Sequence, residues 1–150
     1  MSRHSAWIAW RSDGGFADNS YSRRHRWRFD GGAEVIASAS PDVVPVPRSD
    51  PAGVDPEEAL VASAASCHML WFLSLAQEAG LAVESYEDEA IAEMGRTGPG
   101  RYAIVKITLR PRIAFAGPAP EGAEIDRLHH AAHERCFIAN TLNCEIVVES

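Results

Sequence analysis

The sequence of 150 residues contains only three cysteines, Cys67, Cys136 and Cys144, and no two of them form a CxxC pair. An odd number of cysteines without such a pair excludes a small scaffold held together by disulfides. The chain also lacks the glycine-rich motifs GxGxxG and GxxxxGK[ST], and it lacks the GxSxG motif. Nucleotide-binding and serine-hydrolase functions therefore have no support in the sequence.

The chain has no excess of positive charge, because 14 Lys and Arg stand against 21 Asp and Glu, a net charge of −7. Such an acidic protein is a poor candidate for binding nucleic acid or an anionic membrane. The first residues contain no apolar segment of signal-peptide length, which predicts a cytoplasmic protein. Length and composition predict one globular domain over residues 1–150.

One uncharged stretch, residues 59–76, is long enough to raise the question of a membrane span. Three serines, a cysteine and a histidine make it more polar, and Glu57, Glu58 and Glu78 lie at its ends. A buried central helix is the preferred interpretation, and a membrane span is the alternative. A helix that is apolar on all sides needs more cover than one small sheet provides, so this stretch also predicts a dimer.

The order of predicted elements is that of an α+β fold. A helix is predicted to begin at the cap Asp55 with Pro56 in its first turn, and to end near residue 79 before Gly80. Five prolines within residues 41–56 predict an extended loop before this helix. A second helix is predicted at residues 121–135. The predicted strands are residues 6–10, 21–29, 33–39, 81–94, 102–115 and 145–149.

Arginines alternate along the predicted strand 21–29, so they divide between its two faces. Arg24, Arg26 and Arg28 share one face, which in an acidic protein favours a solvated surface over a nucleic-acid site. Arg23 falls on the other face with His25, Trp27 and Phe29. An arginine carried inward by the two aromatic residues needs a partner; an arginine at a strand end that reaches water is the alternative.

Histidines at the end of the second predicted helix suggest a metal site as an alternative function. His129 and His133 are four residues apart, and Cys136 follows. The sequence HHAAHERC fits no standard zinc pattern, and a helix C-terminus favours His and Arg electrostatically. We therefore expect no bound metal.

Two segments resemble the OsmC/Ohr family of osmotically inducible and organic-hydroperoxide-resistance proteins. The first is the helix start DPEE at residues 55–58, followed by Cys67 in the sequence SCHM. The second is Cys136, at the position of the family's resolving cysteine. The resemblance extends over the whole chain in element order. It implies an OsmC-like fold, with antiparallel sheets packed on a buried central helix, in an intertwined homodimer.

The resemblance also implies a thiol peroxidase that reduces alkyl or fatty-acid hydroperoxides in oxidative-stress defence. Cys67 would become a sulfenic acid and Cys136 would then form a disulfide with it. An external dithiol or a lipoylated protein would reduce the disulfide, without any bound cofactor. By composition alone Cys67 is an inert small hydrophobic residue, so the alternative is a non-enzymatic OsmC-like protein that binds a small molecule.

The family places a Glu and an Arg beside the reactive thiol. Glu57 matches the Glu, and Arg23 is our choice for the Arg, with Arg48 as the alternative. Ten residues of straight helix rise about 15 Å, so Glu57 cannot touch the Cys67 sulfur through its own straight helix. Either the helix is broken near its start, or Glu57 acts through Arg23, or it reaches the partner chain's site. We predict a Cys–Arg–Glu chain of contacts near the dimer interface.

The chain departs from the family pattern at two positions. Phe137 replaces the proline that usually follows the resolving cysteine, and Cys144 is an additional cysteine. Phe137 adds a backbone N–H and a bulky ring, which bears on the resolving step. With Leu70 and Trp71 it is a candidate for an apolar lining that would suit alkyl hydroperoxides better than hydrogen peroxide.

Overall fold

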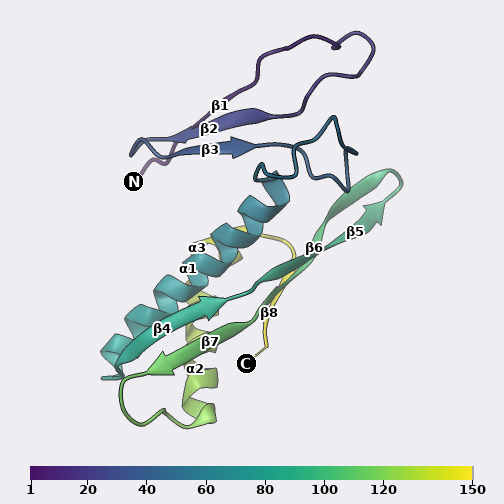
Figure 1. The fold of residues 1–150 in the computed structure, drawn as a ribbon. Helices are drawn as coiled ribbons and strands as arrows, with labels where there is room; N and C mark the ends of the chain where they lie inside the picture. Colours follow the sequence, from purple (N-terminus) through teal and green to yellow (C-terminus); the bar gives the residue numbers. More distant parts are fainter. Residues whose placement is uncertain (150) are drawn as a thin grey trace. The chain divides into compact units, whose positions relative to one another are not determined.

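The computed structural model describes residues 1–149, which form eight strands and three helices (Figure 1). The elements are β1 (Ala6–Ala9), β2 (His25–Phe29), β3 (Glu34–Ala37), α1 (Pro56–Glu78), β4 (Val83–Asp88), β5 (Ile91–Gly98), β6 (Arg101–Leu109), β7 (Pro111–Phe115), α2 (Gly122–Arg135), α3 (Phe137–Thr141) and β8 (Glu145–Val148). This content confirms the α+β class. The chain forms two compact units, Met1–Ala59 and a second that begins at Leu60.

The first unit contains a three-stranded antiparallel sheet in the order β1-β2-β3. The Asp-Gly-Gly turn between β2 and β3 confirms the predicted hairpin, and Gly32 adopts a φ of 90° that favours glycine. β2 is shorter than predicted, because it begins at His25. The backbone before it bonds to the proline-rich loop instead: the Arg23 N–H donates to the Arg48 carbonyl at 2.8 Å.

α1 begins and ends where the sequence predicts. The Asp55 carboxylate accepts a hydrogen bond from the Glu58 N–H at 2.7 Å, and the Glu58 carboxylate accepts one from the Asp55 N–H at 3.0 Å. This reciprocal pair is a capping box. At the other end Gly80 has a φ of 76°, and the Leu81 N–H donates to the Ala76 carbonyl.

The second unit contains two open sheets, one with β4-β7 and the other with β5-β6-β8. Each predicted long strand, 81–94 and 102–115, is divided in two. The division lies where the Asp88 carboxylate accepts a hydrogen bond from the Arg110 N–H at 2.7 Å, beside Pro111 at the start of β7. The antiparallel expectation is wrong for one pair of strands, because β8 runs parallel to β6.

α1 supplies the centre of both hydrophobic clusters in the second unit. Phe72, Leu75 and Ala76 pack against Ala132 of α2. Ala64 packs against β6 residues Ile107 and Leu109. By length and composition α1 could cross a membrane, but these clusters identify it as a core helix. In the single chain Leu70 is 63% exposed, so burial of this helix on every side still needs the predicted dimer, which stays a prediction.

Candidate functional site

The second unit brings Cys67 and Cys136 together. Cys67 lies in the middle of α1 and is half-buried, whereas Cys136 is buried at the junction between α2 and α3. The two thiols lie close enough for Cys67 to raise the pKa of the Cys136 thiol, and neither sulfur is in a disulfide. The spacing of 69 residues in the sequence could not show this contact.

Burial and the neighbouring thiol both act on the Cys136 sulfur. Burial raises the pKa of the Cys136 thiol, and the contact with Cys67 raises it further. The Ala139 N–H, which donates to the Cys136 Sγ at 3.3 Å, acts in the opposite direction on this pKa. Burial and the neighbouring Cys67 therefore favour the protonated form of Cys136.

Cys144 is half-buried and packs with the cluster of Ala64, Ile107 and Leu109. These neighbours are apolar, which suits a cysteine in a packing role.

α3 is a short helix that the sequence did not predict. Cys136 is its N-cap through the Ala139 hydrogen bond. Phe137, its first residue, is 69% exposed and contacts the Trp71 ring edge-on, with 5.6 Å between ring centroids. The Arg135 guanidinium lies 5.7 Å from the same Trp71 ring. Because Trp71 is one helical turn after Cys67, these side chains flank the thiol pair.

A buried histidine pair, which sequence reasoning missed, lies next to the cysteines. His68 is 1% exposed and His129 is 4% exposed. Their Nε2 and Nδ1 atoms are 3.0 Å apart, and their rings are nearly parallel. Burial lowers the pKa of His68 to about 4, and the charges of His129 and His133 act in the same direction. The sequence signal for this pair is a histidine within an uncharged helix, because a buried imidazole needs a polar partner.

The surroundings of His129 do not form a metal centre. Within residues 1–149, no three His, Cys, Asp or Glu side chains are grouped so that they could hold a metal ion. Burial lowers the pKa of His129, and the Asp126 carboxylate opposes this shift. A shallow hollow of about 270 Å³ adjoins the pair; its lining is Asp126, His129, His130, His133, Ile146 and Val148.

In the first unit, Arg23 is held by the loop that precedes β2. Its guanidinium donates to the Tyr21 carbonyl and to the Asn19 side-chain oxygen, both at 2.6 Å, and lies 3.5 Å from the centroid of the Tyr21 ring. Arg23 lies before β2 begins, so the alternation of side chains between the two faces of the strand does not determine which way Arg23 points. A contact between Arg23 and Cys67 stays a prediction, as does the alternative with Arg48.

Glu57 is half-buried in the first turn of α1. α1 is continuous from Pro56 to Glu78, which excludes a helix broken near its start. The two other arrangements for Glu57, through Arg23 or toward a partner chain, stay predictions.

The two faces of β2 differ as the alternation predicts, with one exception. The Trp27 Nε1–H donates to His25 Nε2 at 3.0 Å, so His25 carries its proton on Nδ1 and donates it to the Arg23 carbonyl. Phe29 is exposed rather than in the core, since it lies at the end of the strand. On the other face, Arg24 forms an ion pair with Asp50 at 2.7 Å.

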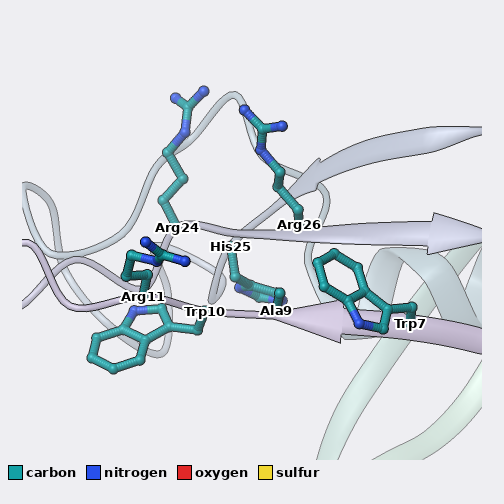
Figure 2. A pocket seen from close by; sticks show the side chains of 7 residues that line it. All are labelled: Trp7, Ala9, Trp10, Arg11, Arg24, His25 and Arg26. Carbon is teal, nitrogen blue, oxygen red and sulfur yellow. The ribbon is translucent and has the colours of Figure 1, made fainter.

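A hollow of about 490 Å³ lies over β1 and β2 in the same unit. Figure 2 shows the Arg24 and Arg26 side chains extending to one side of the strands, with Trp7 beside Ala9. Arg24 and Arg26 are exposed, in agreement with the predicted solvated surface. The lining of this hollow is Trp7, Ala9, Trp10, Arg11, Arg24, His25 and Arg26, which includes none of the cysteines.

Comparisons with known proteins agree with this architecture. The family model described as OsmC-like protein matches residues 49–150. An OsmC-like protein of unknown function from Vibrio cholerae is 49% identical, with 99% of each chain covered and a TM-score of 0.95. No curated protein matches the chain significantly.

More distant solved structures share the fold. An OsmC-type organic hydroperoxide resistance protein from Legionella pneumophila is 16% identical, with a TM-score of 0.70 over 100% of this chain and 98% of that one. An organic hydroperoxide resistance protein from Elizabethkingia anophelis is 17% identical, with a TM-score of 0.73 over 100% and 97%. At these identities the likeness shows the fold alone.

Proposed function

Because this chain belongs to the family of OsmC-like proteins, we propose that it is a thiol-dependent peroxidase that reduces organic hydroperoxides. The observation that carries the proposal is the close approach of Cys136, at the junction of α2 and α3, to Cys67 on α1. Two solved structures with the same fold are named organic hydroperoxide resistance proteins, which supports the same chemistry. The alternative is a binding protein in which Cys67 is only a packed side chain.

The proposed cycle has three steps. The Cys67 thiolate attacks the terminal oxygen of the hydroperoxide, an S–O bond forms as the O–O bond breaks, and the alkoxide takes a proton and leaves as an alcohol. The Cys136 sulfur then attacks the Cys67 sulfenic acid, so that the S–S bond forms and water leaves. An external dithiol, free or on a lipoylated protein, reduces the disulfide and is itself oxidised to a disulfide.

Exposure supports this assignment of roles. Cys67 is half-buried and Cys136 is buried, so a hydroperoxide has easier access to Cys67. Trp71 and Phe137 beside the pair would contact the organic group of the substrate. Apolar contacts of this kind favour an alkyl hydroperoxide over hydrogen peroxide.

The proposal gives Arg23 and Glu57 supporting roles. A cysteine has an ordinary pKa of about 8.5, so a fixed cation is needed to hold a thiolate at neutral pH. An Arg guanidinium cannot lose its proton, and its planar group can hold both a sulfur and a peroxide oxygen. Glu57 would hold this guanidinium in place and offset its burial.

A homodimer is part of the proposal. α1 leaves Leu70 63% exposed in a helix whose stretch from residue 59 to residue 76 has no charged side chain. A second copy of the chain would cover such an apolar face. With the face that carries Leu70 covered, α1 would be buried on all sides, as expected for the central helix that the sequence predicts.

Thiol counting during oxidation tests the function. The reduced protein is mixed with an alkyl hydroperoxide in a stopped-flow instrument, and free thiols are counted before and after. We expect two thiols to be lost per chain, none in Cys67→Ser, and overoxidation in Cys136→Ser, with Cys144→Ser as the matched control that behaves like the wild type. No loss of thiols at millimolar hydroperoxide would contradict the peroxidase and favour the binding protein.

A further inference from the structure

The histidine pair joins the two helices on which the cysteines depend. His68 follows Cys67 directly on α1, and His129 lies on α2, which ends at Cys136. The hydrogen bond of 3.0 Å between their rings is the one side-chain hydrogen bond that links residues 56–78 of α1 to residues 122–135 of α2. Together with the packing of Phe72, Leu75 and Ala76 on Ala132, this bond sets how α2 lies on α1, and with it the position of Cys136.

The pair has little freedom to rearrange. One ring must donate and the other accept, so the two imidazoles share a single proton across the contact. The Phe72 ring covers His129, with 4.5 Å between ring centroids. The outer Nε2 of His129 is buried and has no hydrogen-bond partner within the described residues. Within the described residues, the bond to His68 is thus the one side-chain hydrogen bond that orients this ring.

The charged and titratable groups around the pair come from α2. His133 acts on His68, and Asp126 acts on His129. His130 lies beside them in the hollow, whereas β8 contributes the apolar Ile146 and Val148. The surroundings keep both imidazoles neutral at neutral pH, the state in which an N–H···N hydrogen bond can form.

We propose that His68 and His129 are positioning residues for the resolving step, in which Cys136 attacks the Cys67 sulfenic acid. This inference rests on the proposed peroxidase function. A disulfide requires Cα atoms about 4.4–6.8 Å apart and a defined dihedral angle. A small displacement of the end of α2 therefore slows S–S bond formation. The attack of Cys67 on the hydroperoxide requires no bond to Cys136, so we expect its rate to stay near the wild-type value.

The inference therefore predicts different effects on the two steps, the oxidation of Cys67 and the formation of the disulfide. Without the histidine bond, the Cys67 sulfenic acid forms at the normal rate but reacts with Cys136 more slowly, so it persists for longer. A second hydroperoxide molecule then oxidises the sulfur to a sulfinic acid and leaves as an alcohol. A residue that only stabilised the fold would not separate the two rates in this manner.

The test uses three variants of α2. His129→Leu removes the bond; His129→Asn keeps an amide near the position of Nδ1 and can still bond to His68. His130→Asn is the matched control, because His130 is the exposed neighbour. The rate of Cys67 oxidation is measured by stopped flow with an alkyl hydroperoxide, and mass spectrometry measures the ratio of disulfide to sulfinic acid.

We expect His129→Leu to oxidise Cys67 at the wild-type rate and to form the disulfide about tenfold more slowly or worse. His129→Asn should recover most of the disulfide rate, and His130→Asn should match the wild type. His68→Leu removes the same hydrogen bond by a change on α1. This variant replaces His129→Leu in the test if His129→Leu does not fold. Wild-type disulfide rates in the folded Leu variants would overturn the inference. A wild-type protein that is not oxidised at all would instead overturn the proposed function.

Discussion

At the scale of single residues, the surroundings of Cys67 and Cys136 suit different tasks. Cys67 is half-buried on α1, whereas Cys136 is buried and receives the Ala139 N–H. A buried thiol beside a more exposed one is poorly placed to meet a substrate and well placed to attack its neighbour once that neighbour is oxidised. The sequence could predict both cysteines from motif position. It could not predict that they touch, because contact depends on how α2 packs against α1.

His68 makes stability depend on pH. Its folded pKa of about 4 lies below the ordinary value of 6.5, so the unfolded chain binds a proton first as pH falls. The stability that the neutral His68 provides is full above about pH 6.5 and is lost as pH falls toward 4. The shift corresponds to a loss of about 3 kcal/mol.

Urea unfolding between neutral pH and about pH 4 measures this dependence. We expect His68→Gln to lose less of its free energy of unfolding than the wild type over this range, because glutamine does not titrate. His130→Asn, altered at an exposed histidine, should follow the wild type. A constant difference between wild type and His68→Gln at every pH would contradict the assignment.

At the scale of elements, the ends of α1 could be predicted from local chemistry. Asp55 and Glu58 satisfy each other's backbone N–H groups, and Gly80 adopts a positive φ after the last turn. The division of strands 81–94 and 102–115 could not be predicted, because it depends on a contact between Asp88 and Arg110, which are far apart in sequence. α3 was missed because it is five residues long and capped by a cysteine.

Asp55→Ala tests the contribution of the capping box. Loss of the carboxylate leaves the Glu58 N–H without its partner, so we expect the free energy of unfolding to fall by about 1 kcal/mol. Chemical denaturation measures this change. Asp42→Ala, an exposed change in the preceding loop, should have little effect. Equal midpoints for the two variants would show that the capping box contributes nothing measurable.

At the scale of the whole molecule, the account depends on a second copy of the chain. The uncharged stretch of α1 was the signal in the sequence, and the exposed Leu70 is its structural counterpart. Both the uncharged stretch and the family resemblance predict a dimer, because a single chain leaves part of α1 uncovered. Which surface of the second copy covers it could not be predicted, since that surface is not encoded in local sequence patterns.

Leu70→Glu should weaken the proposed dimer, because a charge would be buried where an apolar side chain packs. Sedimentation velocity at several protein concentrations measures the dissociation constant, and we expect it to rise at least tenfold. Ala123→Glu adds the same charge at an exposed position on α2 and serves as the control. A wild-type protein that sediments as a monomer at all concentrations would contradict the proposed assembly.

The central claim is that Cys67 and Cys136 act as one redox pair. Its most direct test is peptide mapping of the wild-type protein after one equivalent of an alkyl hydroperoxide, under conditions that trap thiols. The account predicts loss of two hydrogen atoms per chain and a single disulfide between the peptides that contain Cys67 and Cys136, with Cys144 still free. An unchanged mass, or a disulfide that involves Cys144, would contradict it.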